Sequence, residues 1–269
     1  MKKFIAVVLL VAVFATLGLT ACGSKNDNTA TTTAPQGTSG ETKATVKTAK
    51  DGVLTMVTNA EFPPYQYYDG DKIVGIDAEV AQLIAEKLGL TLEIVDGDFN
   101  AVVPGVQSGK YDMGMAGLTV NEDRLKSVDF TTSYAKGIQV VIVKEDSGIQ
   151  SIDDLAGKKI GVQETTTGDI YASDDFGEDN VIRYANGAVA VEALKAGKVD
   201  CVIIDNEPAK AYVAANEGLK ILETSYADED YAIAVSKDNP ELKDAIDAAL
   251  KELIADGSLQ KIVDKYIPA

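Results

Sequence analysis

Short apolar runs alternate with amphipathic segments from residue 53 to the end of the chain. The runs that predict strands cover residues 53–58, 90–95, 111–115, 140–143, 160–163, 199–204 and 231–235. Apolar residues at helical spacing predict helices over residues 77–88, 100–106, 189–196 and 207–215, after Gly168, and twice within 240–266. Asp77 is expected to cap the first of these helices and Gly89 to end it. This alternation predicts an α/β fold with mostly parallel sheets.

The start of the chain has the pattern of an export signal. Lys2 and Lys3 precede an apolar run over residues 4–15, which is too short to span a bilayer. Leu-Thr-Ala directly before Cys22 resembles the bacterial lipobox, in which the cysteine is lipidated and becomes the first residue of the mature chain. We therefore expect residues 1–21 to be a lipoprotein signal peptide and Cys22 to anchor the protein on the extracytoplasmic face of the cell membrane. The alternative is an ordinary signal peptide followed by an accidental cysteine.

The segment after Cys22 has the composition of a linker. Residues 23–50 are rich in Thr, Ser, Ala, Gly and Lys, and Val46 is their only aliphatic residue larger than alanine. Such a segment cannot bury enough apolar surface to offset the entropy lost on ordering. We expect residues 22–50 to be a disordered tether.

The charge of the chain excludes several classes of partner. There are 25 Lys and Arg residues against 42 Asp and Glu residues, a formal net charge of −17, and removal of Lys2 and Lys3 would make it −19. This excess of acid argues against binding to nucleic acid or to anionic lipid. No nucleic-acid partner is therefore expected, and nothing in the sequence indicates more than a monomer.

The residue inventory argues against catalysis and metal binding. The chain has no histidine, which excludes Ser-His and Cys-His catalysis and histidine-containing zinc sites. With Cys22 lipidated, Cys201 is the one remaining cysteine, and it lies in an apolar strand pattern typical of a buried, inert thiol. No glycine-rich phosphate loop is present. We expect no catalytic residue, no metal and no cofactor, so the sequence favours a binding protein.

Loops with polar and aromatic residues follow the predicted strands. In α/β sheets, ligands bind at the carboxyl ends of the strands. Arg124, one of only two arginines, lies in such a loop and could bind a carboxylate through two parallel hydrogen bonds. The alternative is a surface arginine paired with Glu122 or Asp123. Thr166 and Thr167 precede a helix and could form an anion site or simply cap the helix.

The same edge carries groups suited to the rest of an amino acid. Asp205 ends a predicted strand, where it could meet an ammonium group or cap the next helix. Phe62 and Phe99 lie in loops and could flank an aliphatic chain or pack the lobe edge. An arginine, an anion site, a carboxylate and two aromatic rings together indicate a zwitterionic α-amino acid as ligand.

Several motifs in order along the chain resemble the polar amino acid-binding proteins of ABC transporters. They are Phe62-Pro63-Pro64-Tyr65, Gly75-Ile76-Asp77, Ala116-Gly117-Leu118-Thr119, Asp123-Arg124, Val128-Asp129-Phe130, Gly161-Val162-Gln163, Thr166-Thr167-Gly168 and Asp205. The resemblance, which runs from about residue 51 to the C-terminus, implies a two-lobe, periplasmic-binding-protein-like (type II) α/β fold. It implies a first lobe of residues 51–133 plus 232–269, a second of 139–227, and hinges near 134–138 and 228–231.

The resemblance also implies a role for each site residue. Arg124 would hold the α-carboxylate with the amides of Thr119 and Thr167. Asp205, the Gly117 carbonyl and the Thr119 hydroxyl would take the α-ammonium. Phe62 and Phe99 would sandwich the side chain. The positions that would face the ligand side chain are Asn59, Glu61, Ala116 and Gln163. Many relatives have aspartate in place of Asn59 and glycine in place of Thr165, which weakens any transfer of specificity.

The side-chain region offers carboxylates and amides but no cation. An acidic ligand would lack a counter-charge there, so glutamate and aspartate are disfavoured. A basic amino acid could pair with Glu61 or Glu164, and glutamine could bond Asn59 and Gln163. We expect a basic amino acid, delivered to an ABC transporter permease, with glutamine as the alternative. Two other functions stay open: a dehydratase with Glu61 or Glu164 as general acid, and an amino acid sensor.

Overall fold

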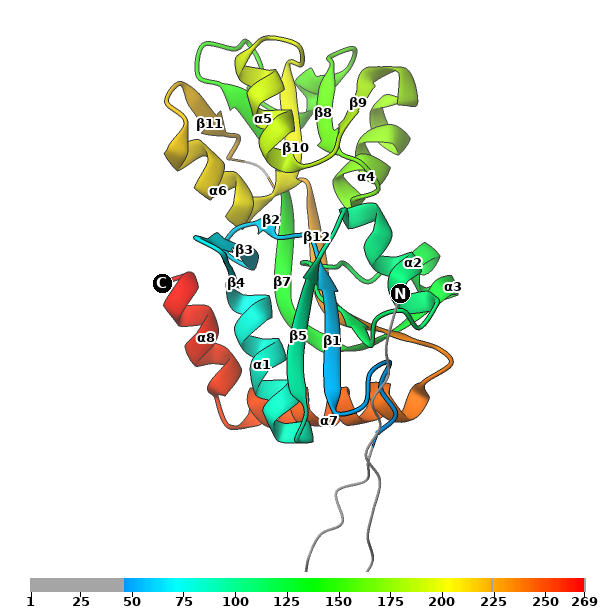
Figure 1. The fold of residues 1–269 in the computed structure, drawn as a ribbon. Helices are drawn as coiled ribbons and strands as arrows, with labels where there is room; N and C mark the ends of the chain where they lie inside the picture. The colour runs from blue at the N-terminus through cyan, green and yellow to red at the C-terminus, as the bar shows by residue number, and fades with distance from the viewer. Residues whose placement is uncertain (1–45, 224, 269) are drawn as a thin grey trace, which may run out of the picture. The chain divides into compact units, whose positions relative to one another are not determined.

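The computed structural model describes residues 46–223 and 225–268 (Figure 1). The predicted signal peptide, Cys22 and the predicted tether up to residue 45 lie outside the described residues. Among the residues that are described, no helix is long and apolar enough to cross a membrane.

Strands and helices alternate as the apolar pattern predicts. The strands are β1 (Val53–Thr58), β2 (Glu61–Phe62), β3 (Gln66–Asp69), β4 (Lys72–Val74), β5 (Thr91–Asp96), β6 (Met113–Gly114), β7 (Val128–Lys144), β8 (Ile160–Gln163), β9 (Val181–Tyr184), β10 (Cys201–Asp205), β11 (Leu219–Ile221) and β12 (Ala227–Ser236). The helices are α1 (Ile76–Leu88), α2 (Val102–Gln107), α3 (Glu122–Ser127), α4 (Thr167–Phe176), α5 (Gly187–Lys195), α6 (Asn206–Ala215), α7 (Pro240–Ala255) and α8 (Ser258–Tyr266). Short 3₁₀ turns lie at Phe99–Ala101, Ile152–Leu155 and Glu178–Asn180.

One mixed sheet runs through both lobes of the fold. Its strand order is β5-β1-β6-β12-β7-β10-β8-β9, with β11 paired to β7. β1 is parallel to β5 and β6, and β8 is parallel to β9 and β10. Between these parallel sets, β7 and β12 pair with each other antiparallel. Figure 1 shows these two strands side by side as they pass from the lower lobe to the upper one. The predicted α/β, two-lobe fold class is confirmed, with antiparallel crossovers between the parallel strands.

The crossover strand β7 is far longer than the apolar pattern predicts. The sequence predicts a strand only over residues 140–143, but β7 has 17 residues. Its first part alternates buried and partly exposed positions, such as Tyr134 and Ala135, because it runs along the junction of the lobes. The predicted hinges near residues 134–138 and 228–231 fall within β7 and β12. The lobe boundaries themselves stay a prediction.

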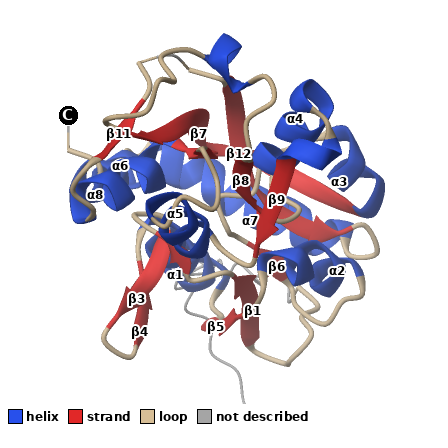
Figure 2. Ribbon diagram, turned by 90° about the horizontal axis from the view of Figure 1, so that it is seen from above, coloured by secondary structure: helices blue, strands red, loops and turns tan. Residues whose placement is uncertain are grey.

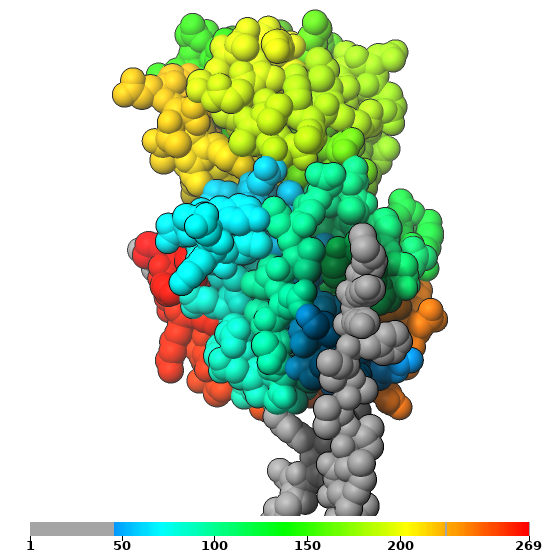
Figure 3. Space-filling model, viewed as in Figure 1, coloured from blue at the N-terminus to red at the C-terminus, as the bar shows by residue number. Residues whose placement is uncertain are grey.

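Helices cover both faces of the sheet in each lobe (Figures 1 and 2). In the first lobe α1 packs against α7 and α8, and in the second α4 and α5 both contact β8. Figure 3 shows the two lobes as separate masses that meet at the level of the β2–β4 sheet. The predicted burial of Cys201 is confirmed, since its side chain is 0% exposed and burial raises the pKa of the thiol to about 12.

The last residues of the predicted tether belong to the folded unit. The Ala49 amide donates to the Asp112 carboxylate at 2.7 Å, and the Asn239 side chain donates to the Lys47 carbonyl at 2.9 Å. Val46, the only large aliphatic residue of the segment, packs against the main hydrophobic core. The prediction of disorder is therefore wrong for residues 46–50. Composition alone missed them because many of their contacts come through backbone groups, which composition does not reveal.

Candidate ligand-binding site

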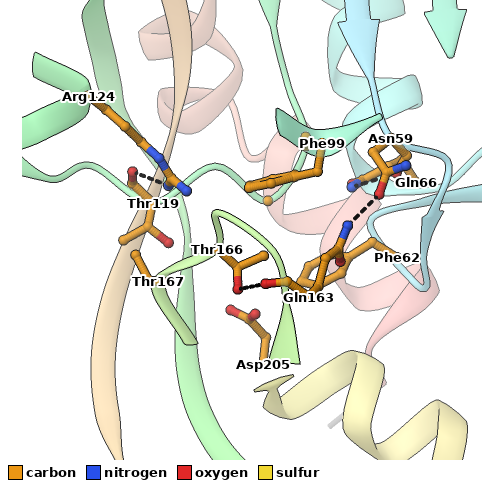
Figure 4. A pocket seen from close by; sticks show the side chains of 12 residues that line it. Asn59, Phe62, Gln66, Phe99, Thr119, Arg124, Gln163, Thr166, Thr167 and Asp205 are labelled. Atoms are coloured by element: carbon orange, nitrogen blue, oxygen red, sulfur yellow. Dashed lines mark hydrogen bonds between the residues drawn. The ribbon is translucent and has the colours of Figure 1, made fainter. Parts of the chain in front are cut away.

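A small cavity lies at the carboxyl ends of the parallel strands, beside the crossover strands β7 and β12. It is lined by Asn59, Phe62, Gln66, Phe99, Ala116, Gly117, Thr119, Arg124, Gln163, Thr166, Thr167 and Asp205 (Figure 4). Eleven of these residues are site residues predicted from the sequence. Their contacts with a ligand stay a prediction.

Glu61 is the predicted site residue that the structure does not bring to the cavity. Its side chain is exposed on β2, and its carbonyl accepts a hydrogen bond from the Tyr212 hydroxyl at 2.8 Å. Gln66, on β3, takes a place in the cavity wall that the sequence did not predict. The two prolines after Phe62 predict a loop, and they do lie in the turn between β2 and β3; the strands on either side of that turn belong to the small antiparallel sheet β2-β3-β4. In a hairpin, successive side chains face opposite sides, so Glu61 points away while Phe62 is buried.

Arg124 lies in α3 and its guanidinium reaches the cavity. The side-chain oxygen of Asn121 caps this helix by accepting the Arg124 amide at 2.8 Å. Nη1 donates to the Thr119 carbonyl at 2.8 Å and Nη2 to the Thr165 carbonyl of the other lobe at 3.2 Å. Arg124 is only 8% exposed. The alternative of a surface arginine paired with Glu122 or Asp123 is therefore wrong.

The guanidinium of Arg124 is buried without a close counter-ion. Among the described residues it forms no ion pair at 4.0 Å or less. Burial lowers its pKa to about 10, and the more distant carboxylates of Glu229 and Asp205 oppose that shift. Since two neutral carbonyls leave most of the five N–H donors of a guanidinium unused, the site is prepared for an anion.

The turn before α4 adds donors beside Arg124. Thr166 caps α4, because its hydroxyl accepts the Asp169 amide at 3.3 Å while donating to the Gln163 carbonyl at 2.8 Å. Thr165 is the one described non-glycine residue with positive φ, at 62°, and its carbonyl is the one that Arg124 contacts. Thr166 thus acts as a helix cap. Thr167, next to it, lines the cavity at the helix N-terminus, where backbone amides favour an anion.

Gly117 is required by two independent constraints. Its φ of 55° lies in the left-handed region, and a Cβ there would stand 2.7 Å from Cε1 of Phe62. Its amide donates to the carboxylate of Asp77 at 3.1 Å. The sequence predicts Asp77 as the cap of α1, but Gly75 occupies that position and Asp77 lies fully buried in the first turn. Burial raises the pKa of Asp77 to about 7. Asp77 therefore fixes the Gly117 loop and does not cap the helix.

Asp205 lies across the cavity from Arg124 (Figure 4). It stands at the N-cap position of α6 but makes no capping hydrogen bond, so the alternative of a helix cap is wrong. Its carboxylate instead accepts a hydrogen bond from the Tyr231 hydroxyl. Asp205 is 7% exposed, and burial, followed by the charge of Glu229, raises its pKa. A cation would stabilise the ionised form of this carboxylate.

Three amide side chains form the end of the cavity away from Arg124. The Gln163 Nε2 donates across the lobes to Oδ1 of Asn59 at 3.0 Å, and the Gln66 Nε2 donates to the Asn59 carbonyl at 3.3 Å. The Asn59 Nδ2 donates to the Gly97 carbonyl at 3.0 Å. Oε1 of Gln66 is buried with no partner among the described residues. Each of these three amide groups uses one of its two N–H donors within the protein, and the unpaired Oε1 of Gln66 adds an acceptor.

Between the two ends stand the two predicted phenyl rings. Phe99 lies with its ring centroid 5.4 Å from Cζ of Arg124, and Phe62 is buried beside Gly117. Glu164, proposed with Glu61 as the partner of a basic ligand, does not line the cavity; it accepts from Asn100 at 2.8 Å. The amide end of the cavity thus holds no carboxylate among the described lining residues.

Comparisons with known proteins agree with this geometry. Residues 54–269 match the bacterial extracellular solute-binding proteins, family 3. The chain is 34% identical to the arginine-binding extracellular protein ArtP of Bacillus subtilis, over 99% of this chain and 98% of ArtP. Among solved structures, an ancestral arginine-binding protein bound to glutamine has a TM-score of 0.77 and 39% identity, covering 82% of this chain and all of that one. An ancestral arginine-binding protein bound to arginine has a TM-score of 0.75 and 41% identity, covering 80% and 98%.

Proposed function

Because this chain belongs to family 3 of the bacterial extracellular solute-binding proteins, we propose that its cavity holds an L-α-amino acid between Arg124 and Asp205. The family consists of extracytoplasmic substrate-binding proteins of ABC transporters and not of enzymes, so the dehydratase alternative has no support. The ligand α-carboxylate would lie on the Arg124 guanidinium and the α-ammonium on Asp205. The observation that carries this proposal is a buried guanidinium, without an ion pair among the described residues, that faces a buried carboxylate across one small cavity.

The charges that line the cavity explain why a zwitterion fits. An isolated buried charge is costly, and both Arg124 and Asp205 are less than a tenth exposed. A zwitterionic amino acid supplies one opposite charge to each of them in a single binding event. A carboxylate can also accept two parallel N–H bonds from a guanidinium, which adds orientation to the charge pairing. Ligands with one charge would leave the other end unpaired.

For the side chain we propose a basic amino acid, with L-arginine as the first candidate. The free acceptor of Gln66 and the oxygen of Asn59 call for N–H donors, which a carboxylate side chain lacks. A planar guanidinium can also stack between the rings of Phe62 and Phe99. Relatives whose names state arginine binding support this choice. Since Glu61 lies outside the cavity, amide oxygens and aromatic faces would replace the carboxylate partner expected from the sequence.

We further propose that Cys22 carries the lipid that keeps the receptor near its permease. The support is the Leu-Thr-Ala-Cys pattern after a short apolar run, which belongs to a part of the chain outside the described residues.

The role of Arg124 is tested by the substitution Arg124→Lys. Lysine keeps the positive charge but loses the bidentate fork, and truncating one partner of a buried charge pair costs about 2–5 kcal/mol. We expect the affinity for L-arginine to fall at least about a hundredfold, measured by isothermal titration, with an unchanged circular dichroism spectrum. The matched control is Arg183→Lys, since Arg183 is an exposed arginine on β9 paired with Asp169 and Glu178. Near-native affinity of Arg124→Lys would contradict the proposed role.

The side-chain preference is tested by competition among three amino acids. L-arginine and L-glutamine end in N–H donors, whereas L-glutamate ends in acceptors only and would bury an unpaired charge beside Asn59 and Gln66. We expect L-arginine to displace L-glutamine, and both to bind at least about a hundredfold tighter than L-glutamate, as an unpaired buried charge costs several kcal/mol. Titration of the ligand-free protein with each amino acid measures this order. Tighter binding of glutamine would assign the neutral ligand, and tight binding of glutamate would contradict the proposal.

The lipid anchor is tested by Cys22→Ala in the full chain. Without the thiol no lipid can be attached, so we expect the protein to leave the membrane fraction and to incorporate no labelled fatty acid. Cys201→Ala is the control, because that thiol is buried in the second lobe. We expect this variant to stay in the membrane fraction, as expected of the native protein. Membrane retention of Cys22→Ala with continued labelling would contradict the anchor.

A further inference from the structure

Residues that do not line the cavity also join the two lobes, at the rim of the cavity. The Tyr212 hydroxyl of α6 donates to the Glu61 carbonyl of β2 at 2.8 Å. Nδ2 of Asn100, just before α2, donates to Oε1 of Glu164 at 2.8 Å. With the lobes divided as predicted, each hydrogen bond has its donor in one lobe and its acceptor in the other. None of these four residues is among the described residues that line the cavity. We call the two hydrogen bonds the rim contacts.

Each rim contact is next to the cavity wall along the chain. Glu61 precedes Phe62 on β2, and Glu164 follows Gln163, the last residue of β8. The donor to Glu164 directly follows Phe99, which also lines the cavity. Figures 1 and 2 show α6 on one side of the crossover strands and α2 with α4 on the other, so the rim contacts join the lobes on opposite sides of these strands.

The Tyr212 side chain is held by its own lobe while its hydroxyl reaches the other. A Cβ on Gly187 of α5 would lie 3.2 Å from Cε2 of Tyr212, and the half-buried ring packs against the main hydrophobic core. Burial, followed by the charge of Glu61, raises the pKa of Tyr212 to about 12, so the hydroxyl keeps its proton and stays a donor at neutral pH. The second lobe thus presents a fixed donor to a backbone carbonyl of the first.

A ligand can reach the cavity only when the lobes part, because Arg124 and Asp205 are both less than a tenth exposed. The crossover strands β7 and β12 run between the lobes, and parting the lobes about these strands separates the partners of each rim contact. A hydrogen bond that exists only in the closed form shifts the equilibrium toward that form by its own net free energy.

We propose that the two rim contacts stabilise the closed form around any amino acid that the cavity accepts, and so slow its release. This inference rests on the proposed function, because it needs an amino acid in the cavity. Since neither contact touches the ligand, losing one should weaken the binding of every ligand by the same factor. Loss of a lining residue would instead change the ratio between ligands. Tyr212 and Asn100 are thus positioning residues that act through the lobes.

The first experiment is the substitution Tyr212→Phe, which removes the hydroxyl and keeps the ring. The net contribution of one hydrogen bond corresponds to about a two- to tenfold change in an equilibrium constant. We expect the affinities for L-arginine and L-glutamine, measured by isothermal titration, to fall by one common factor in this range. Release of each radiolabelled amino acid into excess unlabelled amino acid should be faster by a similar factor. The matched control is Tyr226→Phe, since Tyr226 is a half-buried tyrosine whose hydroxyl donates to the Tyr171 carbonyl of the same lobe at 3.1 Å.

The second experiment reverses the donor and the acceptor of the other rim contact. Asn100→Asp would place two carboxylates face to face, so we expect weaker binding of both amino acids. Adding Glu164→Gln to this variant restores a donor and an acceptor in the opposite order, and we expect most of the affinity to return. Glu164→Gln alone keeps an acceptor oxygen for Asn100 and is the control, with affinity near that of the native protein.

The outcomes separate this inference from the proposed function. Native affinity and release rate in a folded Tyr212→Phe would overturn the inference, and so would a changed ratio of arginine to glutamine affinity. If Tyr212→Phe does not fold, the second experiment decides, and an equal loss in Asn100→Asp with and without Glu164→Gln would overturn the inference. Binding of neither amino acid by the native protein would instead contradict the proposed function, and the inference would fall with it.

Discussion

This site depends on the burial of the Arg124 guanidinium, which forms no ion pair within the part of the chain that the structure describes. The two carbonyls that hold it come from different lobes, Thr119 from the first and Thr165 from the second. Neutral carbonyls orient a guanidinium but do not neutralise it, so the charge is left for a ligand. The same group therefore fixes the carboxylate end of the ligand and ties the lobes together at that end. A lysine could supply the charge but not the fork that spans both carbonyls.

Other contacts in the site fix the positions of its two charged ends relative to each other. The Asp77 carboxylate accepts a hydrogen bond from the Gly117 amide. Gly117 leaves room for the Phe62 ring only because it has no Cβ. On the other side, Tyr231 of the crossover strand β12 donates to Asp205 at the end of β10. The crossover strands thus carry contacts to the ammonium end as well as joining the lobes. This explains how a cavity between two lobes can have fixed positions for both charges.

The sequence predicted the α/β alternation and eleven of the cavity-lining residues, because apolar periodicity and ordered motifs are local signals. It could not predict the contacts that depend on tertiary packing. Glu61 was expected in the cavity and Gln66 was not, but the hairpin turns Glu61 outward and buries Gln66. Asp77 was expected to be a cap because it precedes an apolar helix, and only the fold shows the amide that it accepts. Glu229 lies in a polar stretch of β12, where nothing local marks it as buried.

The central claim is that one cavity recognises both charged groups of an α-amino acid. It is tested most directly by titrating the protein separately with L-arginine and with two analogues. Agmatine lacks the α-carboxylate, and 5-guanidinopentanoate lacks the α-ammonium. The account predicts that each analogue binds at least about a hundredfold more weakly than L-arginine, because each leaves one buried charge of the site unpaired at a cost of about 2–5 kcal/mol. Retention of the L-arginine affinity by either analogue would show that Arg124 or Asp205 does not recognise the ligand backbone.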